Sequence, residues 1–201
     1  MPDAAGKINL AGKLSHPKKL PAIPVKYLGL LSRFKKITTS KKYGLLILLS
    51  GPEPQRSIFE NILLKQIQQY PGSIALVRGL PGNSNTLPNF NNLTAFNHLP
   101  ADKLNELILQ SEVLIARCGY STIMDLAALG KKAILIPTPA QAEQEWLAAY
   151  LSKNKIFYTT AQQNFSLPKS LKEAENFQYV DLQNFEEKTD IIIKAFLEQK
   201  L

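Results

Sequence analysis

The sequence predicts an α/β fold with a doubly wound parallel sheet. Short, strongly apolar runs alternate along the chain with segments of helical pattern, as expected of strand–helix–strand units. The chain has 201 residues, of which 45% are hydrophobic, so it can bury a sizeable core and is expected to form one domain. We expect strands near residues 44–49, 74–78, 93–96, 113–116, 133–136 and 156–158, and a final helix over residues 184–199.

The first expected strand, residues 44–49, leads into a loop over residues 50–57 and then into a helical pattern. Gln55, Arg56 and Ser57 could present hydrogen-bond donors to a phosphate from the start of this helix. The alternative is an ordinary strand-to-helix turn in which Ser57 caps the helix. A later connection, residues 80–92, is long, polar and rich in turn-forming residues, so we expect a surface loop there.

The strand expected at residues 113–116 begins a strand, loop, helix and strand unit. The chain reverses near Gly119, and Ser121 or Thr122 can cap a helix that precedes the strand at residues 133–136. A parallel sheet places the N-terminus of such a helix at the carboxyl edge of the strands, where free N–H groups and the helix dipole attract an anion. We therefore expect a pyrophosphate site at this turn.

Asp125 lies about one turn into this helix and allows two interpretations. Its carboxylate could accept hydrogen bonds from the two hydroxyls of a ribose. Thr122 and Asp125 also have the spacing of a capping box, in which the side chain would only satisfy N–H groups of the helix itself. These residues alone leave both interpretations open.

Four segments, residues 27–34, 50–57, 117–125 and 137–145, carry a resemblance to a known family. Together they resemble the C-terminal, donor-binding half of the GT-B glycosyltransferases, especially the MurG-like enzymes of family 28 that transfer N-acetylglucosamine from UDP. The resemblance implies a Rossmann-like domain, one half of a GT-B architecture, that binds a UDP-sugar. UDP-N-acetylglucosamine is the donor that it implies most directly.

Two of these segments are the most specific. Residues 117–125 are similar to the family signature R-x-G-x-x-T-x-x-E, with Asp125 in place of Glu at the ribose-binding position. Gln144 matches the first residue of a paired Gln-Gln that touches the donor sugar, whereas Glu145 departs from the second and can only accept hydrogen bonds. The first match implies donor contacts from Arg117, Gly119, Tyr120, Ser121, Thr122 and Asp125.

The remaining matches imply contacts with the diphosphate and the base. Gly51 stands where the family has a Gly-Gly-Ser loop, and Arg33 matches an interdomain arginine whose forked guanidinium suits a diphosphate. The alternative for Arg33 is an exposed arginine without a ligand. A weaker match implies that backbone atoms of Phe96, Asn97 and His98 read the uracil edge, although a lone histidine is by default a polar loop residue.

The basic residues are concentrated near the N-terminus. Residues 1–44 hold ten Lys or Arg against the single acid Asp3, a local net charge of +9, whereas the remainder holds 14 basic and 15 acidic residues. We expect residues 1–43 to form a basic interdomain connector and entry segment, and residues 44–201 to form the donor-binding domain. The connector is either a solvated linker or one that also faces an anionic membrane or a lipid-phosphate acceptor. No nucleic-acid-binding motif accompanies the lysines, so we expect no nucleic-acid partner.

A single domain of this kind is only half of a GT-B enzyme. In the family, the N-terminal domain binds the acceptor and, in inverting members, is expected to supply the catalytic base. The resemblance therefore implies a donor-binding chain that needs an absent N-terminal acceptor domain or a partner subunit, contains no catalytic residue and does not transfer sugar alone. The alternatives are half of a UDP-N-acetylglucosamine 2-epimerase and a non-catalytic nucleotide-binding module.

Several common site types are not indicated by the sequence. No metal-ligand cluster, Walker A motif or G-x-G-x-x-G is present, so we expect neither a metal nor a cofactor besides the UDP-sugar substrate. No apolar run approaches the ~18 residues that span a bilayer, so we expect a cytoplasmic chain, or one held peripherally at the inner face of the membrane. The single cysteine, Cys118, excludes an intramolecular disulfide and is expected to be a small packed residue.

Overall fold

The computed structural model describes residues 1–82, 86–181 and 189–198, and within them six strands form one all-parallel sheet in the order β3-β2-β1-β4-β5-β6. The predicted doubly wound parallel sheet is therefore confirmed. From β1 the chain adds β2 and β3 on one side, and then returns to add β4, β5 and β6 on the other side of β1. The strand order therefore reverses between β1 and β4. The strands are β1 (Tyr43–Leu48), β2 (Ile74–Val77), β3 (Leu93–Phe96), β4 (Ser111–Arg117), β5 (Ile134–Ile136) and β6 (Tyr158–Thr159).

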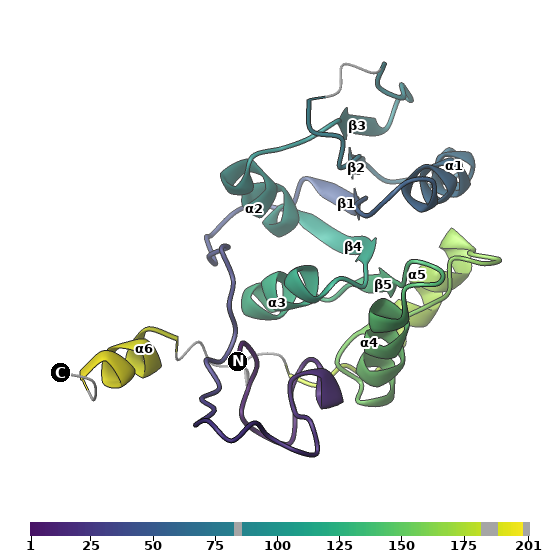
Figure 1. Ribbon diagram of the computed structural model, residues 1–201. Coiled ribbons are helices and arrows are strands. Elements are labelled where there is room, and N and C mark those ends of the chain that lie inside the picture. The colour runs from purple at the N-terminus through teal and green to yellow at the C-terminus, as the bar shows by residue number, and fades with distance from the viewer. Residues whose placement is uncertain (83–85, 182–188, 199–201) are drawn as a thin grey trace.

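Helices cover both faces of this sheet. Figure 1 shows α2 and α3 on one side of the sheet and α1 and α5 on the other. The helices are α1 (Gln55–Ile67), α2 (Ala101–Leu109), α3 (Tyr120–Leu129), α4 (Ala142–Lys153), α5 (Leu167–Glu175) and α6 (Thr189–Glu198), with a short 3-10 turn at Gly12–Leu14. Of the predicted C-terminal helix, residues 184–188 and 199 lie outside the described residues, as do residues 83–85 of the predicted loop.

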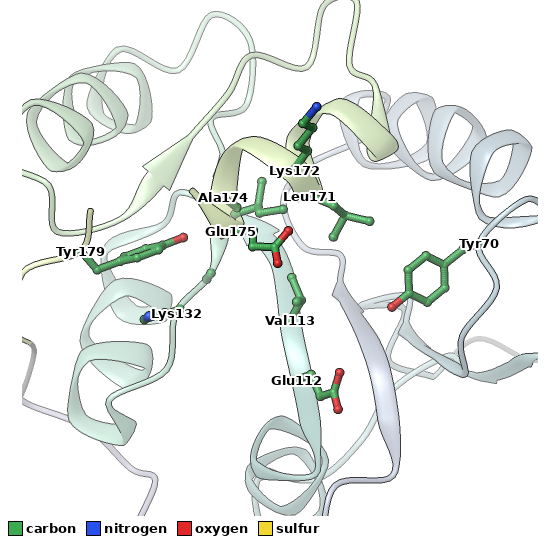
Figure 2. Close-up of a pocket in the computed structure, with 11 residues that line it drawn as sticks. Tyr70, Glu112, Val113, Lys132, Leu171, Lys172, Ala174, Glu175 and Tyr179 are labelled. Carbon is green, nitrogen blue, oxygen red and sulfur yellow. The ribbon is translucent and has the colours of Figure 1, made fainter. Parts of the chain in front are cut away.

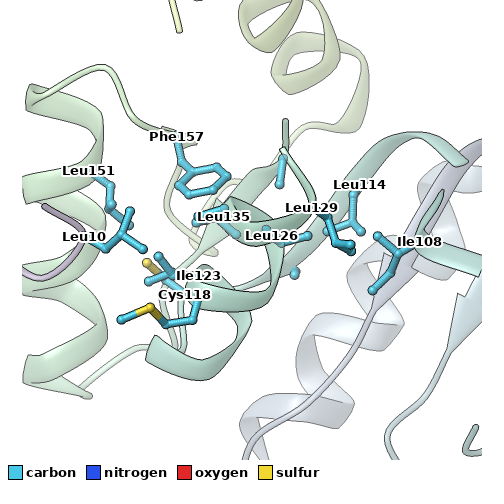
Figure 3. Close-up of a cluster of buried hydrophobic side chains, with 14 of the residues drawn as sticks. Leu10, Ile108, Leu114, Cys118, Ile123, Leu126, Leu129, Leu135, Leu151 and Phe157 are labelled. Atoms are coloured by element: carbon cyan, nitrogen blue, oxygen red, sulfur yellow. The ribbon is translucent and has the colours of Figure 1, made fainter. Parts of the chain in front are cut away.

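The apolar strands are explained by burial on both faces. In β1, Leu45 and Ile47 pack toward α1 and α5, while Leu46 packs toward α2 and α3, and none of the three is exposed. A strand buried on both sides needs consecutive apolar residues instead of an alternating pattern. Figure 3 shows the cluster on the α3 face, where Cys118 lies among aliphatic side chains. Cys118 is fully buried in this cluster, which confirms a packed residue, and the burial raises the pKa of its thiol to about 12.

The N-terminal segment packs against the end of the molecule that carries α3 and α4 (Figure 1). Leu10 and Ala11 are buried in the cluster that contains residues of these helices. The Asp3 carboxylate, itself fully buried, accepts hydrogen bonds from the N–H groups of Leu10 and Ala11 at 2.8 and 3.0 Å and from the Ser15 hydroxyl at 2.5 Å. A buried charge with several donors is well satisfied, so this turn has a fixed conformation on the domain.

Candidate functional site

The point at which the strand order reverses defines where a ligand can bind. The connections that leave the carboxyl ends of β1 and β4 turn to opposite faces of the sheet, toward α1 and α3 (Figure 1). In open α/β sheets, this divergence leaves a crevice that receives ligands. Gly51 and the start of α1 follow β1, and Gly119 with the start of α3 follows β4, so these predicted site residues meet at one edge.

The N-terminus of α3 has no side-chain cap. The helix begins at Tyr120, and Gly119 is its N-cap in an extended conformation with φ −84° and ψ 143°. The prediction that Ser121 or Thr122 caps the helix is wrong, because the chain becomes helical before either residue and both lie in the first turn. The capping-box interpretation of Asp125 fails for the same reason. The N–H groups of this first turn have no side-chain acceptor and can therefore bind an anion.

Asp125 is instead held by the N-terminal segment. Its carboxylate accepts a hydrogen bond of 2.7 Å from the Ser32 hydroxyl, and Arg33 Nε lies 3.9 Å from its other oxygen. Burial raises the pKa of Asp125, and the Ser32 hydrogen bond and the Arg33 charge partly oppose that shift. The Arg33 side chain is 63% exposed and that of Asp125 only 13%. The structure thus brings Arg33 and Asp125, distant in sequence, together beside the first turns of α3.

The start of α1 is organised by a carboxylate that the sequence analysis did not select. Pro54 is the N-cap of α1, and Glu53 accepts hydrogen bonds from the Ser57 N–H at 3.1 Å and the Ser57 hydroxyl at 3.0 Å. Ser57 is therefore not the cap, contrary to the alternative considered from the sequence. Arg56 is buried and pairs with Glu53 at 2.6 Å and with Glu60 at 2.8 Å. Its donors point into the protein, and a phosphate could reach them only if these ion pairs broke.

The same ion-pair network extends to the candidate base-reading segment. Arg78 donates to Glu60 at 2.5 Å and to the Asn97 side-chain oxygen at 2.9 Å. Phe96 is half-buried and His98 is exposed at the carboxyl end of β3. These residues share the carboxyl edge with α3, but two strands, β2 and β1, lie between β3 and β4. The i,i+4 spacing of Arg56 and Glu60 was the sequence signal for this network.

Arg117 joins four parts of the carboxyl edge. Its side chain is only 2% exposed, and its guanidinium donates to the Gln55 carbonyl oxygen at 2.9 Å, to Gln162 Oε1 at 2.7 Å and to the Pro137 carbonyl oxygen at 3.4 Å. It also lies over the ring of Phe59 at 4.6 Å. Burial lowers the pKa of Arg117 to about 10. The first residue of the recognised motif therefore contacts protein groups, and Gln55 is engaged by Gln162 Nε2 at 2.9 Å as well.

The predicted sugar-binding pair shapes the loop after β5. Gln144 Oε1 accepts from the Thr138 N–H at 2.9 Å, and Glu145 Oε1 accepts from the Ala140 N–H at 3.1 Å. Among the described residues, the Thr138 hydroxyl is one of the buried polar groups without a hydrogen-bond partner. A Cβ atom added to Gly51 would lie 3.7 Å from it. Thr138 is a further candidate for a ligand contact that the sequence analysis did not select, and its position shortly after the parallel strand β5 was the available signal.

Two of the cavities among the described residues lie at opposite edges of the sheet. One, of about 370 Å³, lies where the N-terminal segment meets the starts of α3 and α4, and is lined in part by Pro2, Tyr120 and Glu143. The Tyr120 hydroxyl donates to the Pro2 carbonyl oxygen at 2.5 Å, and burial raises the pKa of Tyr120. Figure 2 shows the other, of about 510 Å³, which lies at the amino ends of β4 and β5 between Tyr70 and Tyr179. It is on the opposite edge of the sheet from the candidate site.

The six-stranded parallel sheet with helices on both faces is a Rossmann-like α/β fold, the kind found in the C-terminal domains of GT-B glycosyltransferases. The family model for the glycosyltransferase family 28 C-terminal domain matches residues 79–196, more than half of the chain. The chain therefore belongs to this family. None of the curated proteins compared with the sequence matches it.

Solved structures show the same fold at low sequence identity. The glycotransferase of kitacinnamycin has a TM-score of 0.58 and 15% identity, with 83% of this chain covering 44% of that one. SnogD from Streptomyces nogalater gives 0.51 and 14%, covering 90% and 48%. VinC, solved in complex with dTDP, gives 0.50 and 11%, covering 78% and 41%. The chain thus spans less than half of the length of each of these glycosyltransferases.

No cluster of three or more His, Cys, Asp or Glu side chains able to hold a metal ion is found within residues 1–82, 86–181 and 189–198. In the same part of the chain, none of the helices combines the length and apolar character needed to cross a bilayer.

Proposed function

We propose that this chain binds the UDP-sugar donor, most specifically UDP-N-acetylglucosamine, of a MurG-like inverting glycosyltransferase. The observation that carries the proposal is the uncapped N-terminus of α3 at the point where the strand order reverses, with Asp125 and Arg33 beside it. An anion-binding helix end, a carboxylate one turn further on and an exposed guanidinium match a diphosphate joined to a ribose. Membership of the family supports the same assignment.

The proposed donor occupies the crevice with its diphosphate at the first turn of α3. The N–H groups of this turn and Arg33 stabilise the negative charge that develops on the UDP leaving group. Asp125 accepts hydrogen bonds from the ribose hydroxyls, and Gly51, without a side chain, lets the diphosphate approach the backbone of its loop. Gln144 and Glu145 hold the loop after β5 and orient the sugar through it.

Sugar transfer is proposed to need a second domain or a partner subunit. The acceptor hydroxyl attacks the anomeric carbon with inversion, and a base outside this chain removes its proton. That base and the acceptor site belong to an N-terminal domain or partner subunit, as expected of a domain that spans less than half of the GT-B glycosyltransferases it is similar to. Three predicted site residues hydrogen-bond to other protein groups and are proposed to hold the site in shape without contacting the donor: Arg117, Arg56 and Gln55.

Calorimetric titration tests this proposal. We expect UDP and UDP-N-acetylglucosamine to bind without magnesium, and more tightly than GDP or NAD. Asp125→Ala should weaken UDP binding by about 5- to 150-fold, corresponding to about 1 to 3 kcal/mol for a hydrogen-bonded carboxylate. Asp102→Ala, at an exposed acid in the first turn of α2, is the matched control and should leave the affinity unchanged. Equal affinity for all nucleotides would support a non-catalytic nucleotide-binding module instead.

A further inference from the structure

An exposed loop of the N-terminal segment, residues 17–26, is held together at its base. The rings of His16 and Tyr27 stack with centroids 4.3 Å apart and planes inclined by 10°. The Tyr27 hydroxyl donates to the Ser15 carbonyl oxygen at 3.1 Å, and the Ser15 hydroxyl in turn donates to the buried Asp3 carboxylate at 2.5 Å. The two ends of the loop are therefore fixed to the domain while its tip extends into solvent.

The tip of this loop carries apolar side chains among lysines. All residues from 18 to 24 are exposed, and their sequence is Lys-Lys-Leu-Pro-Ala-Ile-Pro. Leu20 is 50% exposed and Ile23 is 71% exposed. The prolines restrict the backbone, so little conformational freedom remains to be lost when the tip meets a surface. Three exposed lysines flank the apolar pair: Lys18, Lys19 and Lys26.

The rest of the N-terminal segment, residues 1–44, also combines exposed apolar side chains with positive charge. The one acid of residues 1–44, Asp3, is buried and hydrogen-bonded to backbone N–H groups, so it forms no ion pair with any of the ten basic residues there. Among the described residues, no ion pair is found for the three loop lysines. Seven of the ten exposed large apolar side chains in the described part of the chain belong to residues 1–37: Met1, Ile8, Leu14, Leu20, Ile23, Leu31 and Ile37.

We propose that residues 17–26 dock on an anionic lipid surface, with Leu20 and Ile23 inserted at the level of the headgroups and the lysines beside the lipid phosphates. Apolar side chains next to a cluster of lysines bind such surfaces through buried apolar area and electrostatic attraction together. A protein partner fits the loop less well, since protein interfaces are depleted in lysine and enriched in aromatic residues and arginine. The docking does not depend on the donor site, which lies on other residues.

Vesicle co-sedimentation of the full chain tests the docking. We expect binding to vesicles of phosphatidylcholine mixed with phosphatidylglycerol, weakened by salt, and little binding to phosphatidylcholine alone. Removing the apolar pair in L20S/I23S should lower the partition coefficient about tenfold or more. Removing the charges in K18Q/K19Q/K26Q should lower it on the order of 100-fold, because each lysine near an anionic surface contributes a factor of roughly five.

Matched controls remove the same kinds of side chain elsewhere. K65Q/K103Q/K169Q makes the same change of net charge at exposed lysines of α1, α2 and α5, and I58S removes an exposed apolar side chain of α1. Both should sediment with anionic vesicles like the wild type. Equal losses in the loop and control variants would overturn the proposal in favour of general surface charge. Binding to polyglutamate but not to vesicles, lost only in the lysine variant, would also overturn it and assign the loop to an acidic protein.

Discussion

The Ser32 hydroxyl donates a 2.7 Å hydrogen bond to the Asp125 carboxylate. A residue of the N-terminal segment therefore already bonds to the carboxylate that we propose as the acceptor for the ribose hydroxyls. Ser32 also accepts a hydrogen bond from the Phe34 N–H at 3.0 Å, which fixes the turn that places Arg33 beside Asp125. A serine hydroxyl resembles a sugar hydroxyl in its hydrogen bonding. A bound ribose must therefore displace Ser32 or share the carboxylate with it.

Ser32→Ala tests which of these occurs. If Ser32 competes with the ribose, its removal should tighten UDP binding by roughly fivefold, since one net hydrogen bond contributes about 1 kcal/mol. Calorimetry with UDP measures the change, and Ser40→Ala, at an exposed position of the same segment, is the control. A weaker affinity would instead show that Ser32 orients Asp125 in the bound state.

The two arginines of the recognised motifs should respond differently to the same substitution. Arg117→Met removes a buried guanidinium that satisfies Gln55, Gln162 and Pro137 oxygens, and should lower the free energy of unfolding by about 2 to 4 kcal/mol. Arg33→Met, at an exposed side chain, should leave the free energy of unfolding within about 0.5 kcal/mol of the wild type and weaken UDP binding. Urea denaturation and calorimetry on both variants separate the two roles. Loss of UDP affinity in a fully stable Arg117→Met would contradict the structural role.

The strands could be predicted from the sequence, whereas the roles of the arginines could not. Leu45, Leu46 and Ile47 are apolar because both faces of β1 are buried, and such runs are recognisable without any partner. Arg117 was expected to contact the donor because it matches the first residue of the family signature. Its burial depends on Gln162, which is far away in the sequence, so only the tertiary structure reveals it.

The start of α3 illustrates a local failure of prediction. Ser121 and Thr122 are the favoured cap residues by type, but Gly119 is the N-cap because the backbone enters the helix there. Residue type alone does not decide between neighbouring positions in an irregular turn. The carboxyl edge of the sheet could be located from the order of strands and helices, whereas the individual contacts at that edge depend on the tertiary structure.

Two glycines with the same backbone angle should differ in what they tolerate. Gly79 and Gly82 both have φ +70°, but a Cβ on Gly79 would lie 2.3 Å from the Leu49 carbonyl oxygen, whereas one on Gly82 would meet nothing within 4 Å. Gly82→Ala should cost about 1 kcal/mol from the strained φ alone. Gly79→Ala should cost at least about 3 kcal/mol, because the end of β1 must move. Thermal or urea unfolding of both variants measures the difference, and equal costs would contradict the close approach.

Lys131 should make stability depend on pH. Its ammonium is buried against the Ser111 carbonyl oxygen, which Lys41 also contacts, and burial together with the Lys41 charge lowers the pKa of Lys131 to about 7. The lysine pKa in the unfolded chain is about 10.4. At pH values between the folded and the unfolded pKa, the unfolded state therefore binds more protons than the folded state. The free energy of unfolding should therefore rise from pH 7 to about pH 10. Lys131→Met should remove this rise relative to the wild type, as measured by urea denaturation across the pH range.

Thr138→Val separates a ligand contact from a defect of packing. The Thr138 hydroxyl is buried without a partner beside Gly51, and an unsatisfied buried hydroxyl destabilises a protein. Replacement by valine keeps the shape and removes the hydroxyl, so stability should stay equal or increase by about 1 kcal/mol. If the hydroxyl donates to the bound diphosphate, UDP affinity should fall by about fivefold in the same variant. Opposite changes in stability and affinity would identify a polar group kept for its ligand, and an unchanged affinity would assign Thr138 to the loop alone.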